Sequence, residues 1–362
     1  MAITMKEIAR LANVTQPAVS AALNGADTVK VSESTRKLIL EIARAHNYTP
    51  NRAAQQLKGK ASRTIGIFGV PYVSELNQTQ LLALSLELEK RGYNLLSCYG
   101  RDEIEKDALN SMAAKGVDGI IVTTQENPLL ESDLKIPYVH IPPWAGDSFD
   151  GAVDHCGGFC EMGRYLISAG CRRIAFLGIN KLSNTSPHYP DRVKYAGLRA
   201  AAEACGLPET ELSAFSYEEA DFSVSKLIGF IRSTSPDAVC CANDYLAAET
   251  ILNLQRSGFS VPEDIKVLGY DGLTLVNFVS PPIATVSQPI FGLAGFAVEL
   301  LLQRIRNKEE FQPVKKLFSP TFLPNSSCGF QSPPEDRLRL VNTFSTLESD
   351  RILNHTNYLH EA

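Results

Sequence analysis

The sequence predicts an all-α segment at the N-terminus, followed by an α/β body whose parallel sheets carry helices on both faces. Residues 1–50 contain three short helical patterns, whereas short apolar runs typical of buried strands alternate with helical patterns over residues 62–330. The charge divides at nearly the same place. Ten positive and four negative side chains give residues 1–63 a net charge of +6, so the remainder of this −5 chain carries −11. A basic segment on an acidic body indicates a nucleic-acid-binding module joined to a separate domain.

The composition describes a globular protein and excludes several other classes. The 362 residues are 44% hydrophobic and 21% charged, which is enough chain for about two or three domains. No apolar run approaches the ~18 residues of a membrane span, and the N-terminus lacks the apolar core of a secretory signal. The eight cysteines show no CxxC spacing. We therefore expect a reduced, cytoplasmic protein with no membrane partner.

Caps and turn residues mark the helices of the N-terminal segment. Thr4 and Glu7 form a capping box that opens the first helix, and a tight turn follows at 12–15. A second helix is predicted within 15–25, and Ser32 caps a third. The positions expected to face inward are Ile8, Ala9, Leu11, Ala12, Val19, Ala22, Leu23, Leu38, Ile39, Ile42 and Ala43. Three short helices with a tight turn between the first two form a helix-turn-helix pattern.

The second helix has the composition of a DNA-recognition helix. Its outward positions are expected to be Gln16, Pro17, Ser20, Ala21 and Asn24, and small side chains there allow the backbone to approach the floor of the major groove. Gln16 can pair with adenine, while Pro17 and Ala21 can meet thymine methyl groups. The alternative is a three-helix packing unit that makes no DNA contact.

Residues 51–61 are predicted to form a hinge helix and linker between the basic segment and the body. Leu57 is apolar within a polar, basic run, which favours a wedge inserted into the minor groove. The alternative is that Leu57 packs on the neighbouring domain. Short polar side chains near the helix ends can bind phosphates. The predicted DNA-binding residues are Thr4, Met5, Thr15, Gln16, Pro17, Ser20, Ala21, Asn24, Lys30, Ser32, Thr35, Asn51, Ala54 and Leu57.

The body alternates strands and helices. Its apolar runs are TIGIFGV, YNLLSC, DGIIVTT, PYVHI, RRIAFLG, DAVCCAN, DIKVLGY and KKLFSPTFL. The helical segments between them lie near 78–91, 104–115, 157–169, 193–205, 222–232, 244–257 and 290–306. Sheets built this way bind ligands at the carboxyl ends of their strands.

A series of motifs follows in a fixed order along the chain. It starts with TMKEIARLANVTQPAVSAALNG, VSESTR, YTPNRAAQQL and IGIFGVP, and continues through VDGIIV, RRIAFLG, CANDYLA, VPEDIKVLGYD and ATVSQP. This series resembles the lactose repressor (LacI) family of bacterial transcription regulators. The resemblance covers roughly residues 3–329, and the remaining residues match nothing in the pattern.

The resemblance implies a fold for the whole chain. It implies a helix-turn-helix domain over 1–50, the hinge at 51–61, and a periplasmic-binding-protein-like body over 62–330 made of two doubly wound parallel-sheet subdomains. One subdomain would combine residues 62–158 with 289–316, and the other would combine 159–288 with 317–330. The tail, residues 331–362, is left without a role, although Leu338, Val341, Phe344 and Leu347 could form one helical face.

The resemblance also implies an effector site between the two subdomains. The residues it points to are Asp154, Arg192, Lys194, Phe222, Asn243, Asp271 and Gln288. Capping or turn formation is the alternative role for each of the polar ones. Several positions depart from the family pattern: Lys194 stands for the usual arginine, Gly272 for an aspartate and His155 for an asparagine. Ala21 also replaces an arginine common in the recognition helix, so DNA readout is expected to depend on Gln16, methyl contacts, Lys30 and DNA shape.

The sequence therefore predicts a transcriptional repressor that binds operator DNA as a homodimer and responds to a sugar or sugar derivative. It contains no P-loop, GxGxxG, GxSxG or HExxH motif, so we expect no enzyme activity, no cofactor and no metal site. Asp154, His155, Cys156 and Cys160 have no standard zinc spacing. The alternatives are a sugar-binding protein or enzyme on the same body, and an architectural DNA-binding protein without ligand control.

Overall fold

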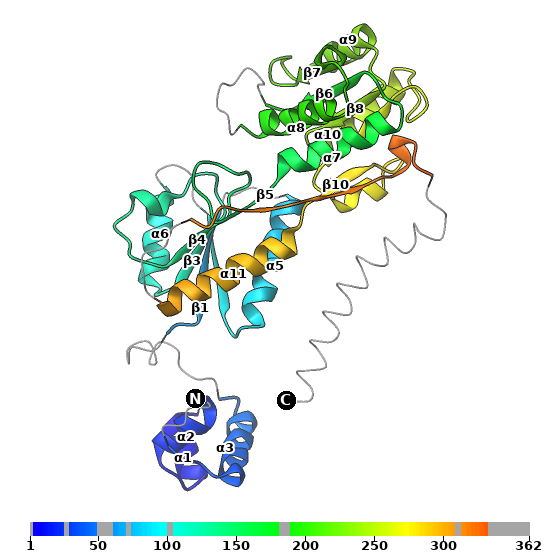
Figure 1. Cartoon of the computed structure of the whole chain (residues 1–362). Coiled ribbons are helices and arrows are strands. Elements are labelled where there is room, and N and C mark those ends of the chain that lie inside the picture. The colour runs from blue at the N-terminus through cyan, green and yellow to red at the C-terminus, as the bar shows by residue number, and fades with distance from the viewer. Residues whose placement is uncertain are drawn as a thin grey trace. The chain divides into compact units, whose positions relative to one another are not determined.

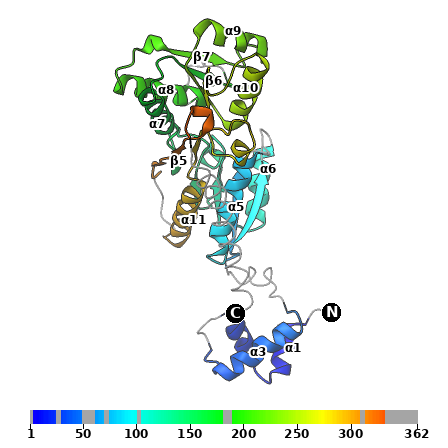
Figure 2. The same ribbon diagram turned by 90° about the vertical axis from the view of Figure 1, so that its right-hand side faces the viewer.

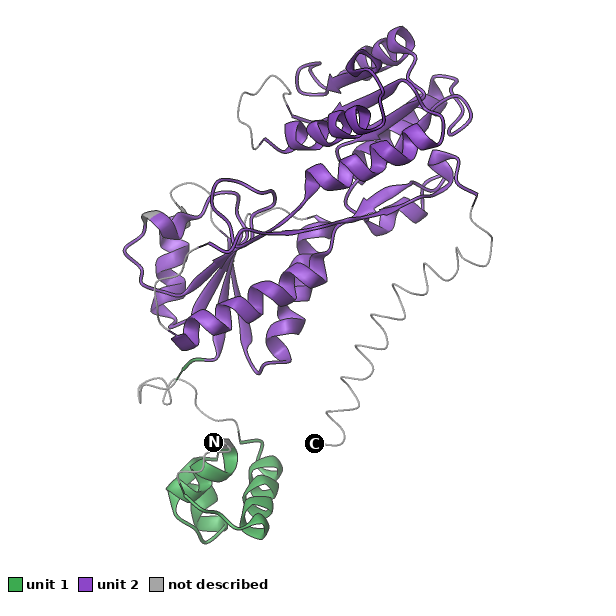
Figure 3. Ribbon diagram, viewed as in Figure 1, with its two compact units in different colours: residues 1–62 green, residues 63–362 purple. Residues whose placement is uncertain are grey.

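The computed structural model of the chain is shown in Figure 1 and, turned by 90°, in Figure 2, and it describes residues 3–24, 29–48, 61–69, 74–99, 104–180, 189–307 and 313–331. The chain divides into two compact units, residues 1–62 and 63–362 (Figure 3). The first unit is all-α and the second is α/β with parallel sheets, so the predicted fold class is confirmed. The predicted hinge helix, with Asn51, Ala54 and Leu57, lies outside the described residues, as does the tail after residue 331.

The first unit consists of α1 (Met5–Leu11), α2 (Gln16–Asn24) and α3 (Glu33–Ala45) around a small core. The capping box is present, since Thr4 N donates to Glu7 Oε2 at 2.8 Å and Glu7 N donates to Thr4 Oγ1 at 3.3 Å. The core joins Ile8, Val19 and Ile39 with several alanines.

Two of the expected core positions in the first unit are wrong. The side chains of Leu11 and Leu38 are 49% and 43% exposed. The core between three short helices is filled mostly by alanine methyl groups, so it encloses too little volume to cover leucines at its edge.

The second unit begins with a four-stranded parallel sheet in the order β2-β1-β3-β4. The strands are β1 (Thr64–Gly69), β2 (Asn94–Tyr99), β3 (Gly119–Val122) and β4 (Tyr138–His140). Side chains alternate along β1, so Ile65 and Ile67 face α5 (Glu75–Glu89) and α11 (Ile290–Asn307), whereas Phe68 faces α6 (Ile104–Ala114). Figures 1 and 2 both show α5 and α11 side by side. We call this sheet with its three helices the first lobe.

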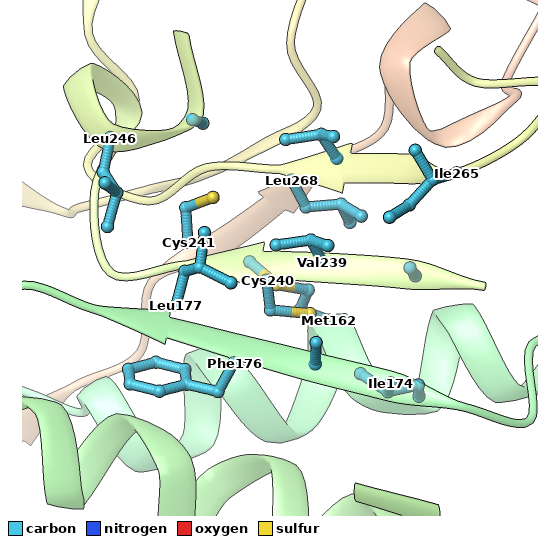
Figure 4. Close-up of a cluster of buried hydrophobic side chains, with 14 of the residues drawn as sticks. Met162, Ile174, Phe176, Leu177, Val239, Cys240, Cys241, Leu246, Ile265 and Leu268 are labelled. Atoms are coloured by element: carbon cyan, nitrogen blue, oxygen red, sulfur yellow. The ribbon is translucent and has the colours of Figure 1, made fainter. Parts of the chain in front are cut away.

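The second lobe repeats the same strand order as β7-β6-β8-β9, also parallel. Its strands are β6 (Ile174–Gly178), β7 (Leu212–Ser216), β8 (Ala238–Cys241) and β9 (Lys266–Leu268). Its helices are α7 (His155–Ser168), α8 (Pro190–Ala204), α9 (Val224–Thr234) and α10 (Asp244–Arg256). One large apolar cluster fills this lobe, with Met162, Phe176 and Cys240 among its members (Figure 4).

Short strands accompany the chain where it passes between the lobes. β5 (Gly151–Val153) pairs in parallel with β11 (Lys316–Phe318), and β10 (Thr285–Ser287) pairs antiparallel with β12 (Thr321–Leu323). Among the described residues there are also four 3-10 turns: η1 (Pro128–Glu131), η2 (Glu209–Glu211), η3 (Thr274–Asn277) and η4 (Ser326–Cys328).

Two polar contacts stabilise these passages. Arg304 of α11 donates to both carboxylate oxygens of Asp150, at 2.8 and 2.6 Å, and this ion pair is buried beside β5. Between the lobes, Glu75 Oε1 at the start of α5 accepts a hydrogen bond of 2.7 Å from the backbone N–H of Thr274 at the start of η3. These two partners are 199 residues apart in the sequence.

Candidate functional site

The N-terminal end of α2 forms the exposed face of the predicted recognition helix. Thr15, Gln16 and Pro17 are exposed and Ser20 is half-buried, and α2 carries no charged side chain. The expectation that Ala21 faces outward is wrong, because its methyl group is only 1% exposed. A single methyl group does not extend past its neighbours, so Ala21 cannot reach a thymine methyl from this position. The side chain of Asn24 lies outside the described part.

The remaining polar groups of the first unit cluster at helix starts. Thr4, Ser32 and Lys30 are exposed, Thr35 and Met5 are half-buried, and Met5 packs against the core. Ser32 Oγ accepts from Thr35 N at 3.2 Å, and the two hydroxyls lie 2.7 Å apart. The short hydroxyl groups therefore cap helices at the surface of the unit.

In the second unit, Asp271 and Gln288 meet where the chain passes between the lobes. Gln288 Nε2 donates to Asp271 Oδ1 at 2.7 Å. Asp271 has a φ of +118°, a conformation that costs free energy in any residue with a Cβ and that often marks functional sites. Burial raises the pKa of Asp271 to about 6, although the positive charge of Lys194 and the hydrogen bond from Gln288 act in the opposite direction.

Lys194 is held by neighbours within the second lobe. Its Nζ donates to the backbone oxygen of Ala242 at 2.7 Å and lies 5.0 Å from the centre of the Tyr270 ring, a cation–π distance. The lysine on α8 therefore approaches the ends of two strands. Arg192, two residues earlier on the same helix, is half-buried.

Two predicted site residues act as helix caps. Asp154 Oδ1 accepts from Gly157 N at 2.8 Å at the start of α7, and Asn243 Oδ1 accepts from Leu246 N at 2.8 Å at the start of α10. Both residues therefore cap helices, which is the role that the sequence offered as the alternative to ligand binding. Phe222 lies in a turn before α9 and is 64% exposed.

Sequence reasoning missed a buried pair behind these residues. Tyr270 OH lies 2.7 Å from His155 Nδ1, and His155 Nε2 lies 2.8 Å from the backbone oxygen of Pro143. Because a carbonyl oxygen only accepts, Nε2 carries the imidazole proton and the tyrosine donates to Nδ1. Burial lowers the pKa of His155 to about 3, with Lys194 adding to the shift. The histidine in place of the family's asparagine was the only signal in the sequence.

Asp244 is a second residue that the sequence reasoning missed. It is fully buried, accepts from the Thr285 hydroxyl at 2.6 Å and accepts from Leu273 N at 2.8 Å. Burial raises the pKa of Asp244 to about 8 despite these hydrogen bonds. The carboxyl group thus ties the start of α10 to the segment that carries Asp271.

The first lobe contains a cavity of about 370 Å³ at the carboxyl ends of β1, β2 and β3. Of the seven predicted effector residues, only Gln288 lines it. Its walls are Ile67, Gly69, Leu76, Asn77, Gln78, Gln80, Leu81, Leu84, Ser97, Tyr99, Thr123, Pro142, Pro143, Val153, Gln288, Ile290 and Leu293. A cavity of this size is within the range of small-molecule sites. Within the described ranges, no three histidine, cysteine or acidic side chains come together as a metal site would require.

Two protein families match the chain. Residues 4–51 match the family described as "Bacterial regulatory proteins, lacI family", and residues 164–328 match the "Periplasmic binding protein-like domain". The first match coincides with the three-helix unit and the second with most of the second lobe and the final passages.

Curated relatives match over nearly their whole length. The HTH-type transcriptional repressor PurR of Aliivibrio fischeri is 32% identical over 337 residues, which cover 90% of this chain and 98% of the relative. The ribose operon repressor of Haemophilus influenzae is 29% identical over 315 residues, covering 85% and 93%.

Solved structures share the fold. The lac repressor dimer bound to operator and the anti-inducer ONPF superposes with a TM-score of 0.74 at 22% identity, covering 91% of this chain and 99% of that one. The complex of the transcriptional regulator CelR with cellobiose gives a TM-score of 0.62 at 26% identity, covering 90% and 99%.

Together these matches define a class: a transcription regulator that joins a helix-turn-helix unit to a periplasmic-binding-protein-like body. The chain belongs to the lacI family of bacterial regulatory proteins. In the part of the chain that the structure describes, none of the helices has the length and apolar character needed to cross a membrane.

Proposed function

We propose that this regulator is a cytoplasmic repressor that binds operator DNA as a homodimer and changes its operator affinity when a small effector, a sugar or sugar derivative, binds between the lobes. The observation that carries the proposal is the combination of two parts in one chain. One is a +6 N-terminal segment with an exposed, uncharged helix start. The other is a pair of lobes with a cavity and polar side chains at their strand ends. The relatives named as repressors support it.

The proposal assigns DNA readout to the start of α2. Gln16 is exposed and carries an amide that can bond both adenine N6 and N7, and the exposed hydroxyl groups of Thr4, Thr15 and Ser32 can bond phosphates. One short recognition helix reads few base pairs, so two copies on a pseudo-palindromic operator are needed for specificity.

The DNA test is a gel shift combined with binding-site selection. We expect Gln16→Ala to lose about 1–3 kcal/mol of affinity for the selected operator and to relax preference at one base position. Glu89→Gln, a change at an exposed position of the second unit, is the matched control and should bind as the unchanged protein does. An unaltered base preference in the Gln16 variant would show that α2 is oriented differently on DNA.

The effector part of the proposal rests on Lys194, Asp271 and Gln288. These side chains already bond groups in or between the lobes, so a ligand that exchanges those bonds can favour one arrangement of the lobes over another. We expect Asp271→Asn to abolish the effector response while operator affinity without effector stays within about twofold of the unchanged protein. Asp221→Asn, at an exposed turn, is the control.

Enzymatic activity is not part of the proposal, because the relatives PurR and the ribose operon repressor are named as repressors. Sedimentation at micromolar concentration tests the homodimer. A monomer that binds a single half-site with full affinity would refute that part of the proposal without affecting the rest.

A further inference from the structure

The start of η3 in the second lobe is capped by a residue of the first lobe. The N-cap residue of η3, Leu273, offers the turn no side-chain hydrogen bond. The acceptor for the N–H of Thr274 is instead Glu75 Oε1 of α5, at 2.7 Å. α5 begins with a separate cap, since Ser74 Oγ accepts from Asn77 N at 3.2 Å. The carboxylate of Glu75 therefore joins the lobes and is not needed to begin its own helix.

The N–H of Thr274 follows three consecutive N–H groups that are bonded without the first lobe. These three bonds run from Asp271 N to Val286 O at 2.9 Å, from Gly272 N to Thr285 Oγ1 at 3.2 Å and from Leu273 N to Asp244 Oδ2 at 2.8 Å. They hold the segment that contains Asp271 in its unfavourable conformation, with a φ of +118°. A movement that separates α5 from η3 therefore breaks the fourth bond and leaves the other three in place.

The bond of Glu75 can break and form again more readily than a buried contact between the lobes. Thr274 is exposed and Glu75 is half-buried, so water can replace either partner. By contrast, His155 at the start of α7 donates from Nε2 to the oxygen of Pro143, which follows β4, at 2.8 Å, and His155 is 5% exposed. Separation at His155 would leave buried polar groups unpaired. The bond between Glu75 and Thr274 is therefore the one suited to reversible release.

We propose that Glu75 is a latch residue: it holds the lobes in the arrangement of this structure, and its release from Thr274 accompanies the change of arrangement that alters operator affinity. The latch goes beyond the proposed function, which assigns no role to Glu75, and only its link to operator affinity rests on that function. Thr274 lies three residues after the predicted effector residue Asp271 on the same bonded segment, so a change at Asp271 reaches the latch through the backbone.

Two single variants and their combination break the latch from either side. Glu75→Ala removes the acceptor, and Thr274→Pro removes the donor. Proline suits this site, because it is favoured at the first position of a helical turn and Leu273 has the extended backbone (φ −75°, ψ 155°) that precedes proline. Both changes act on one bond, so the double variant should show the same effect as either single variant. Glu89→Ala, exposed at the other end of α5, is the control.

The first measurement is the distance between the lobes in the full chain, by single-molecule FRET. Fluorophores are attached through unnatural amino acids at the exposed positions Lys115 and Arg256, one in each lobe, because the chain has eight native cysteines. Labelled chains are diluted in unlabelled protein, so that only distances within one chain are recorded. We expect the ratio of a second distance to the first to rise about three- to tenfold in all three latch variants, the effect of one hydrogen bond, and to stay unchanged in Glu89→Ala.

The second measurement is amide hydrogen exchange at single residues. In Glu75→Ala the amide of Thr274 should exchange about three- to tenfold faster, because its acceptor is gone. The amide of Leu273, still bonded to Asp244, should exchange as in the unchanged protein. Faster exchange at both amides would show that the whole segment opens, and this result would overturn the inference.

Affinity for the selected operator, measured by gel shift, is the third readout. Both single variants should change it by at least about twofold and in the same direction, whereas Glu89→Ala should not change it. The inference is overturned by an unchanged distance between the lobes in the latch variants, by additive effects in the double variant, or by operator affinities equal to that of the control. If the unchanged protein binds no operator, the proposed function fails, and the distances and exchange rates still decide whether Glu75 holds the lobes.

Discussion

The two lobes of the second unit share one strand order and differ in what lies inside them. The second lobe has a single continuous apolar cluster, whereas the sheet of the first lobe separates two clusters on its opposite faces. At the strand ends the contrast is sharper. In the second lobe Tyr270 bonds His155 and Asp244 bonds Thr285, while the first lobe has a cavity and the hydroxyl of Ser97, which has no partner among the described residues.

The buried carboxyl groups of the two lobes are also stabilised in different ways. Asp150 in the first lobe is paired with Arg304, whereas Asp244 in the second is neutralised by its raised pKa and bonded only by neutral donors. Equal topology therefore does not produce equal sites in the two lobes. A ligand can fill space in the first lobe, but in the second it must compete with bonds that the protein already makes.

The largest effect is expected from Arg304→Ala in the first lobe. The change leaves Asp150 as an unpaired buried charge, so the free energy of unfolding should fall by about 3–5 kcal/mol. The control is Arg199→Ala, which breaks an exposed ion pair with Glu209 and should lower it by less than about 1 kcal/mol. Urea unfolding measures both, and similar losses would contradict the importance of burial.

Asp244→Ala should have the next largest effect, in the second lobe. It leaves the N–H of Leu273 and the hydroxyl of Thr285 unpaired inside the protein, which predicts a loss of about 1–3 kcal/mol in the free energy of unfolding. Asp264→Ala, in an exposed loop of the same lobe, is the control. If both variants unfold at the same urea concentration, the buried network does not stabilise the lobe.

The raised pKa of Asp244 predicts a pH dependence of stability with a definite sign. In the unfolded chain this group ionises near its ordinary value of 3.8, whereas in the folded protein it keeps its proton until about pH 8. Stability contributed by this position therefore falls as the pH rises from 3.8 to 8 and is level above that. Asp244→Asn removes the titration, so its stability relative to the unchanged protein should improve across this window.

The matched control for the pH series is Asp237→Asn. Burial of Asp237 is outweighed by hydrogen bonds from the backbone N–H groups of Arg172 and Arg173, so its pKa is lowered. Its contribution is present above the ordinary pKa and lost on acidification, which is the opposite sign. Equal slopes for the two variants would contradict the assignment of Asp244.

The smallest effect is expected when the lobes each lose one hydroxyl. Tyr270→Phe removes the donor to His155 and should lower the free energy of unfolding by about 1 kcal/mol. Ser97→Ala in the first lobe should produce no loss. Thermal unfolding of the two variants compares the lobes directly. If Ser97→Ala lowers the free energy of unfolding as much as Tyr270→Phe does, the Ser97 hydroxyl is not unpaired and the two lobes do not differ in this respect.

Much of the fold follows from short apolar runs, and the strands that were missed lack such a run. All eight predicted runs contain strands, with the last divided into β11 and β12. β7 escaped prediction because it is an edge strand in which three of the five side chains are only half-buried, so its sequence LSAFS lacks a strong apolar signal. β5 and β10 have three residues each and, unlike the equally short β4 and β9, they lie in none of the predicted apolar runs.

The candidate site was predictable only in part. Position after a strand pointed to Asp154 and Asn243, but the same position starts a helix, where the same residue types are favoured as caps. Sequence alone therefore cannot separate the two roles. The cavity forms where α5 and α11 pack against β1 and β2, which are segments distant in the sequence. A local sequence pattern also cannot show that the buried hydroxyl of Ser97 lacks a partner among the described residues.

The two residues that form the hydrogen bond between the lobes, Glu75 and Thr274, differ in their tolerance to mutation. One partner is a side chain and the other is a backbone N–H, which every residue except proline possesses. Nearly any substitution at position 274 would keep the donor, whereas most substitutions at position 75 would remove the acceptor. If selection maintains this hydrogen bond, it should therefore conserve the residue at position 75 and leave position 274 free to vary.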